Sequence, residues 1–566
     1  MSSEPHQKNQ PGLFSDWFDS FYASYYRHRP VNATFIGVHD YDGRLPDCSE
    51  NGLEALQAET VALRLDLDGF PHETLSRSQR LDRELAAGFL DIQEWELSSG
   101  HFQRGNPAYY TGEIVFGVMS LFLRAFTTLE ERVESAIDRL EAIPALLHQG
   151  RNNVPSAPHE WTERAIRDCA GADRFFQSGI DSLIRDTGLD HRLRTAADGA
   201  VQAVGEHRKH LSNELLHGTS TAYACGEAAF DLLMRRGHFL DMSATDILRH
   251  AEEQASESEA RLNEGASGFG ASSWQEALKR LAGAHPLAIG YYQRYSEFWD
   301  ACRSTAEAQK LLTWPDYPIQ YVPRPKWSRD AAPHLYFLFY RSPAPYDNVP
   351  IVDYLVTPIE PDMPQAEQER LLRANNDSVI KLNHVVHHGS IGHHVQNWHA
   401  FRAESRIGQM AAVDCASRIA MFCGGTMAEG WACYATDLMR EAGFLTPLER
   451  YSQHHARLRM AVRAIVDVRL HRGEFTINEA ATYYQQRVGM PPGVAMDEAV
   501  KNSMFPGAAM IYLIGADLIH ELRRDLSVLQ GSQFRLCAFH DRLLSYGSVP
   551  VQLISTQMRK DAACAE

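Results

Sequence analysis

Hydrophobic residues recur at helical spacing along most of the chain. In the segments 129–147, 243–262 and 448–470 apolar residues return every three or four positions. Strand patterns are few, and the clearest are the segments 319–322, 334–340 and 351–356, which are rich in β-branched or aromatic residues and have a proline close by. The pattern predicts a mostly α-helical fold with a small β-sheet.

Nothing in the pattern divides the chain clearly into domains. Its 566 residues could hold several by length alone, but no low-complexity linker, charge block or internal repeat separates them. We expect a disordered N-terminus over 1–12, a single helical domain over 13–560 and a tail over 561–566, with two lobes at about 13–312 and 313–560 as the alternative division. The Gly/Ser/Ala stretch 265–273 is the expected mobile loop.

Composition limits the kinds of binding partner and the cellular compartment that we expect for this protein. A hydrophobic content of 44% and a charged content of 22% are ordinary for a globular protein with a large core, and a net charge of −17 disfavours nucleic acid or an anionic membrane as partner. Residues 1–10 lack the apolar core of a signal peptide, which predicts a cytoplasmic protein. The nine cysteines are scattered without a Cys-x-x-Cys pair and indicate buried thiols rather than disulfides.

Candidate chemistry is concentrated in one segment. Four histidines lie within residues 387–394, which is difficult to explain by packing. Neutral imidazole is the commonest protein ligand of zinc, and catalytic metal sites usually combine three protein ligands, often two histidines and a carboxylate. Glu429, at the start of a helical segment downstream, is the first candidate for the carboxylate. A histidine pair followed by a glutamate on a later helix is the order found in glutamate-type zincins.

These motifs resemble a known family. The segment 387–396, HHGSIGHHVQ, and the segment 429–432, EGWA, are similar to H-E-x-x-P-G-H-x-x-Q and E-G-W-A of the bacterial domain-of-unknown-function 885 family, a group of mostly helical, zincin-like proteins. The blocks 30–41, 463–471 and 506–515 extend the resemblance over nearly the whole chain. It implies a large zincin-like helical domain with a small sheet beside an active-site cleft, and a divalent metal, zinc or alternatively iron, held by His387, His393 and Glu429.

The chain departs from the family pattern at chemically important positions. His388 stands where the family has the glutamate that acts as general base, and Ile391 replaces its proline. Lys501-Asn502 stand in place of Arg-Tyr, and Ala508 in place of Gln. These changes speak against ordinary peptide hydrolysis. His388 is expected either to act as an altered base or to serve as a fourth metal ligand.

Three further residues complete the predicted site, and each has a structural alternative. Asp467 and His471 are expected to bond to the metal ligands or to face the substrate, or else to form a surface ion pair at a helix end. Tyr512 is expected to contact substrate or to pack in the core through a bonded hydroxyl. Glu429 could instead close a capping box with Thr426, and the histidine cluster could be a polar, His-rich helix.

Helix geometry leaves a second ligand set open. His387 and His393 lie about 120° and about 9 Å apart on a regular α-helix, so they can share a metal only if the helix breaks. Gly389 and Gly392 favour such a break. On an unbroken helix the natural pair is His384 with His388, spaced i to i+4.

The leading hypothesis is a metal-dependent enzyme on a peptidase-like scaffold, in which the metal polarises a carbonyl of a small peptide-like or amide-bearing metabolite. One alternative keeps the metal in a non-hydrolytic biosynthetic enzyme: a lyase, isomerase, cyclase or non-haem iron oxygenase. The other is a non-catalytic relative that binds peptides or partners. The sequence does not determine the oligomeric state.

Overall fold

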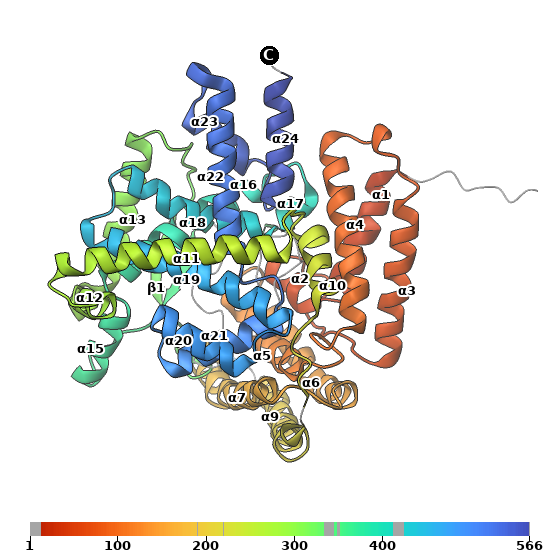
Figure 1. Cartoon of the computed structure of the whole chain (residues 1–566). Helices are drawn as coiled ribbons and strands as arrows, with labels where there is room; N and C mark the ends of the chain where they lie inside the picture. Colours follow the sequence, from red (N-terminus) through yellow and green to blue (C-terminus); the bar gives the residue numbers. More distant parts are fainter. Residues whose placement is uncertain are drawn as a thin grey trace, which may run out of the picture.

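The computed structural model describes residues 13–188, 191–218, 220–332, 345–347, 351–410 and 424–564. Within these ranges the chain is mostly α-helical with one two-stranded sheet, as the hydrophobic pattern predicts (Figure 1). No helix in these ranges combines the length and the apolar character needed to cross a lipid bilayer.

The N-terminal part of the chain folds into helices α1 to α9. They are α1 (Phe14–Arg27), α2 (Pro30–Ile36), α3 (Glu50–Leu67), α4 (Arg77–Ser98), α5 (Pro107–Leu123), α6 (Leu129–Asn153), α7 (His159–Arg174), α8 (Ile180–Thr187) and α9 (His191–Asn213), with short 3₁₀ or π turns η1 (His72–Thr74), η2 (Phe175–Gly179) and η3 (Leu215–His217). The predicted helix 129–147 is α6, which begins where the Thr128 hydroxyl accepts the Glu131 N–H and continues to Asn153.

The middle of the chain contains the sheet. Its elements are α10 (Glu227–Leu232), η4 (Leu233–Gly237), α11 (Ala244–Ala266), η5 (Ser267–Phe269), α12 (Trp274–Leu281), η6 (Ala288–Gly290), α13 (Tyr291–Ala308), β1 (Ile319–Pro323), α14 (Lys326–Arg329) and β2 (Val352–Val356). Strands β1 and β2 match two predicted strands within a residue and pair in parallel, with Ile319 opposite Val352. The predicted strand 334–340 lies outside the described residues. The stretch 265–273 forms the end of α11, the turn η5 and the N-cap of α12.

The C-terminal part carries both predicted motifs. It consists of α15 (Gln365–Ala374), the π-helix η8 (Val379–Gly389), α16 (His393–Ala400), α17 (Arg406–Met410), α18 (Gly425–Glu441), α19 (Pro447–His471), α20 (Ile477–Val488), α21 (Pro492–Met504), α22 (Ile511–Gln530), η9 (Gly531–Gln533), α23 (Leu536–Leu544) and α24 (Val551–Ala563). The predicted helix 448–470 is α19, which starts with a capping box between Thr446 and Glu449. Helix α24 continues into the segment 561–566 that was expected to be a tail.

Two helix pairs organise the C-terminal part. Helix α11 packs along α19, and α18 packs along α22. At the second crossing a Cβ atom on Gly430 would lie 2.4 Å from the Gly515 carbonyl carbon, so the two backbones approach as closely as glycine allows. This crossing fixes the position of Glu429, the neighbour of Gly430. The largest apolar core contains residues from Phe14 to Met558, so the two ends of the chain share it.

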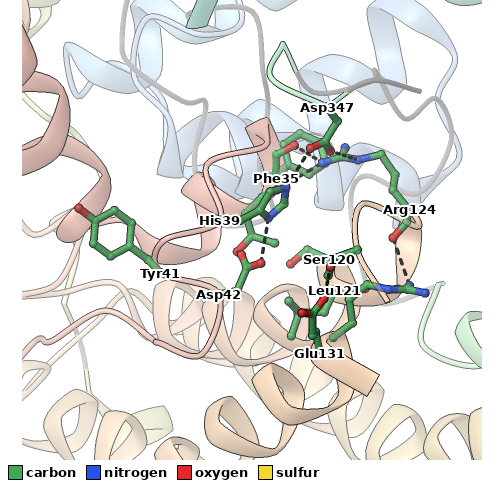
Figure 2. A network of polar contacts seen from close by, with 12 residues as sticks. Phe35, His39, Tyr41, Asp42, Ser120, Leu121, Arg124, Glu131 and Asp347 are labelled. Carbon is green, nitrogen blue, oxygen red and sulfur yellow. Dashed lines mark hydrogen bonds and ion pairs between the residues drawn. The ribbon is translucent and has the colours of Figure 1, made fainter. Parts of the chain in front are cut away.

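The segment after α2, part of the family-like block 30–41, holds an ion-pair network (Figure 2). His39 bonds through Nδ1 to Asp42 at 2.8 Å and through Nε2 to Asp347 at 2.9 Å. Arg124 donates to the other Asp347 oxygen at 3.0 Å and to the Phe35 carbonyl at 2.6 Å. The network therefore ties the segment between β1 and β2 to the C-terminal end of α2. Burial lowers the pKa of His39, but the two aspartates outweigh it and raise the pKa to about 9.

We predict that the two ion pairs of His39 in this network stabilise the fold only while His39 is protonated. Because the folded pKa lies above the ordinary value near 6.5, the contribution is complete below about pH 6.5 and is lost as pH rises through about 9. His39→Gln should lower the free energy of unfolding by about 2 kcal/mol at pH 6, allowing for the partial exposure of the ring, and by little at pH 10. Urea unfolding at several pH values measures the difference, with the exposed His148→Gln as control. A pH-independent difference would contradict the prediction.

Candidate metal site

The histidine segment is a helix that breaks. Helix η8 has π winding from Val379 to Gly389, and the regular helix α16 resumes at His393. Between them the chain passes so close to itself that a Cβ atom on Gly392 would lie 1.9 Å from the His387 carbonyl oxygen. Only glycine can occupy this position without moving the backbone. The break proposed for Gly389 and Gly392 is therefore present.

Two tryptophan side chains satisfy the carbonyl groups that the break exposes. The indole N–H of Trp299 on α13 donates to the Gly389 carbonyl at 2.8 Å, and that of Trp431 on α18 donates to the Ile391 carbonyl at 2.9 Å. Buried carbonyls at a helix end otherwise lack partners, so these bonds stabilise the broken conformation. Trp431 belongs to the same EGWA segment as Glu429.

The break turns His393 back toward His387, and both rings meet Glu429 from α18. The Glu429 Oε2 atom lies 3.2 Å from His387 Nε2 and 3.4 Å from His393 Nε2. Ligand atoms about 2.0–2.1 Å from a tetrahedral zinc ion are separated by about 3.3 Å. Both separations from Glu429 match the spacing between two zinc ligands. Their side chains are 12–16% exposed, which leaves the site accessible to solvent.

His388 lies beside this set. Ring nitrogens of His387, His388 and His393 all lie within 4.8 Å of one another. His388 Nδ1 is 2.7 Å from the carbonyl oxygen of Asn383. A carbonyl only accepts, so the neutral ring carries its proton on Nδ1 and its lone pair on Nε2. This tautomer suits either a base or a fourth ligand.

The competing pair, His384 with His388, is not aligned. The π winding of η8 places one more residue in each turn, so positions i and i+4 no longer lie above each other. His384 Nδ1 lies 2.7 Å from the Tyr354 hydroxyl, against β2, and His384 is not among the histidines whose nitrogens converge. The structure therefore favours His387 and His393.

Burial and mutual charge set the protonation of the cluster. Burial lowers the pKa of His387, with His393 adding to the effect and Glu429 opposing it. Burial, followed by His387 and His393, holds the pKa of His388 well below its usual value. Burial alone would raise the pKa of Glu429, but His393 and His387 outweigh it and hold that pKa well below the usual range. Neutral imidazoles and an ionised carboxylate are the forms that bind a metal.

The capping-box alternative for Glu429 is wrong. Helix α18 starts after Gly424 without a side-chain cap, and the Thr426 hydroxyl accepts the Val551 N–H at 3.2 Å instead. The helix is therefore anchored to α24 through Thr426, and Glu429 is available to the histidines.

Asp467 and His471 bond to the backbone of the segment around residues 502–510. The Asp467 carboxylate accepts N–H groups from Gly507, Ala509 and Met510 at 2.8–3.0 Å. His471 Nε2 lies 2.9 Å from the Asn502 carbonyl. Both side chains are fully buried, so the surface ion-pair alternative is wrong. Their hydrogen bonds hold the connection between α21 and α22, and the role expected for them beside the metal ligands or the substrate stays a prediction.

Tyr512 lies next to α19, where the guanidinium carbon of Arg463 is 4.8 Å from its ring centroid. This cation–π contact joins α22 to α19. Tyr512 is partly exposed. It packs against the apolar core, and its contact with substrate stays a prediction.

Two residues next to the cluster were not predicted from the sequence. Cys433 Sγ lies 4.0 Å from His387 Nδ1, on the nitrogen opposite the one that faces Glu429. The sequence could have indicated Cys433, because it follows Glu429 by one helical turn and lies on the same helix face. The sequence did not indicate Asn383, because the hydrogen bond between its carbonyl and His388 forms only when this segment winds as a π-helix.

Comparison with known proteins identifies the family. A model described as "Bacterial protein of unknown function (DUF885)" matches residues 30–558, so the chain belongs to this family. No curated protein matches the sequence significantly. Two solved structures share the fold. A candidate lipoprotein of unknown function from Shewanella oneidensis has a TM-score of 0.77 at 22% identity, covering 97% of this chain and 100% of its own. A candidate lipoprotein from Colwellia psychrerythraea has a TM-score of 0.76 at 18% identity, covering 97% and 99%.

We predict that Gly392→Ala disrupts the break. The added methyl group would overlap the His387 carbonyl, so the backbone must open and the two rings separate. We expect a loss of roughly 2 kcal/mol in the free energy of unfolding. The matched control is Gly199→Ala on α9, where a Cβ meets no atom within 4 Å. Urea unfolding compares the two variants, and wild-type stability of Gly392→Ala would show that the close approach is not required.

Proposed function

We propose that this protein is a metal-dependent enzyme acting on a small peptide-like or amide-bearing metabolite, with an altered general base. The observation that carries the proposal is the convergence of His387 Nε2, His393 Nε2 and Glu429 Oε2 at separations of 3.2 and 3.4 Å. Two ring nitrogens lie this close to a carboxylate oxygen either because each ring donates a hydrogen bond to it or because the three atoms share a cation. Zinc is the cation that this donor set suits best.

Each residue then has a defined task. His387, His393 and Glu429 hold the ion, which supplies Lewis-acid polarisation of a substrate carbonyl when bound. Cys433 lies against Nδ1 of His387, at the nitrogen that carries the proton while Nε2 binds. The residual exposure of the three ligand side chains, 12–16%, supports access for a small substrate.

His388 is proposed as the base. It occupies the position of the family's general-base glutamate, and Asn383 directs its lone pair to Nε2. Burial lowers the pKa of His388 and so makes its imidazole a weaker base than a histidine in water. Its ring nitrogen also lies at a different distance from the backbone than a glutamate oxygen would. A generic peptidase would keep the carboxylate. This difference supports a specialised substrate, as expected for a biosynthetic enzyme or one that processes a single metabolite.

The location of the protein in the cell is a separate part of the proposal. The cytoplasmic location predicted from residues 1–10 stays a prediction. The descriptions of the two structural neighbours as candidate lipoproteins name an alternative outside the cytoplasm.

We predict that natively purified protein contains one zinc ion per chain and that His387→Ala and Glu429→Gln each lose it. Removing one of three ligands typically weakens zinc binding by orders of magnitude. Elemental analysis and zinc titration with a competing chelator measure the effect, and His148→Ala is the control because His148 is exposed and remote from the cluster in sequence. Iron instead of zinc would favour oxygen chemistry. Failure of the wild-type protein to bind any divalent metal would refute the proposal.

We predict that His388→Glu gains hydrolysis of simple dipeptides, because it restores a carboxylate base beside the ion. A gain of at least about tenfold over wild type is expected, since general bases contribute about 10²–10⁴-fold. His388→Gln is the matched control: it has the same size as Glu but cannot accept a proton. Ninhydrin or chromatographic detection of free amino acids, with zinc content checked in each variant, measures the outcome. Equal rates in the two zinc-loaded variants would mean that position 388 does not face the reacting bond.

A further inference from the structure

Arginines are frequent on α19, and most have an acidic partner. Arg457 pairs with Asp517 at 2.7 Å, Arg463 with Glu498 at 2.7 Å and Arg469 with Glu252 at 2.6 Å. Arg459 lies between the first two of these and differs. It is exposed, and no carboxylate or hydrogen-bond acceptor among the described residues binds its guanidinium group.

The surroundings of Arg459 are positively charged. Arg463 lies one turn further along the same face of α19. Its positive charge is the largest cause of the lowered pKa of Arg459. Glu498 is close to both arginines, but it is already bonded to Arg463 and also lies near Lys501. Arg459 and Arg463 thus lie near one carboxylate, Glu498, in a protein whose net charge is −17. Such a local excess of positive charge is unfavourable unless an anion binds there.

The same group is close to the metal ligands. Helix α19 packs against η8. The positive charge of Arg459 contributes to the lowered pKa of His387. The charge of Arg463 opposes the burial that raises the pKa of Cys433, and Cys433 contacts His387 from α18. Arg459 therefore belongs to the helix that packs against the histidine helix, and its charge is felt at the His387 ring.

We propose that Arg459 binds a carboxylate of the substrate while the carbonyl to be attacked lies at His387, His393 and Glu429. This inference rests on the proposed function and deepens it by naming the substrate class: peptide-like acids with a carboxylate next to the reacting amide. The planar guanidinium group pairs with a carboxylate through two parallel hydrogen bonds, which fixes orientation as well as charge. Arg463 is already paired with Glu498 and lies over the Tyr512 ring, so Arg459 is the guanidinium left to bind the carboxylate.

The test uses thiol probes on the zinc-loaded full-length protein. Mercaptoacetyl-glycine and mercaptoacetyl-glycylglycine place a zinc-binding thiolate at two distances from a carboxylate, and each is compared with its carboxamide. Isothermal titration measures the four affinities for wild type, Arg459→Gln and Arg459→Lys. The control is Arg249→Gln, an exposed arginine on α11 whose partner is Glu253.

We expect at least one acid to bind wild type about tenfold or more tightly than its amide, the size of one charge-assisted contact. Arg459→Gln should remove this preference, leaving amide affinity and zinc content unchanged; Arg459→Lys should keep part of it and Arg249→Gln all of it. Equal binding of acids and amides by wild type, or an undiminished preference in Arg459→Gln, overturns the inference and leaves the metal site standing. If the protein binds neither zinc nor any thiol, the proposed function fails and the inference fails with it.

Discussion

The close contact between Gly392 and the carbonyl group of His387 is the constraint on which the site depends. Residues six apart on a regular helix face different directions, and these two histidines meet only because the chain folds back between η8 and α16. No side chain fits at position 392, where a Cβ would be 1.9 Å from that carbonyl oxygen. The reversal leaves backbone carbonyls exposed, and indole donors from α13 and α18 satisfy them.

The EGWA segment acts as one physical unit. Trp431 holds the broken helix through the Ile391 carbonyl, Gly430 allows α18 to approach α22, and Glu429 supplies the carboxylate. Because the three functions come from adjacent residues on one helix, the position of the carboxylate relative to the histidines is fixed by the same contacts that stabilise the break. This coupling explains how a site assembled from distant segments can keep separations of 3.2 and 3.4 Å.

Charge is distributed unevenly around the site. The chain as a whole is strongly acidic, yet α19 presents Arg459 and Arg463 on the side of the histidine cluster with one carboxylate, Glu498, between them. A local positive region in an acidic protein attracts anions to one place and repels them elsewhere. The proposed metal and the proposed carboxylate contact thus belong to one electrostatic arrangement.

Local patterns in the chain were enough to predict much of the fold. Apolar periodicity located α6, α11 and α19, and β-branched runs located β1 and β2, because each of these signals depends on neighbours within a few residues. Resemblance to a motif located the histidines and Glu429. Tertiary structure decided the rest. It decided the π winding that separates His384 from His388, the backbone amides that bind Asp467 and the contact of Cys433 with His387. It also left Arg459 without a bound acceptor among the described residues. These features depend on residues far apart in the chain, whose approach is set by packing and not by any local period.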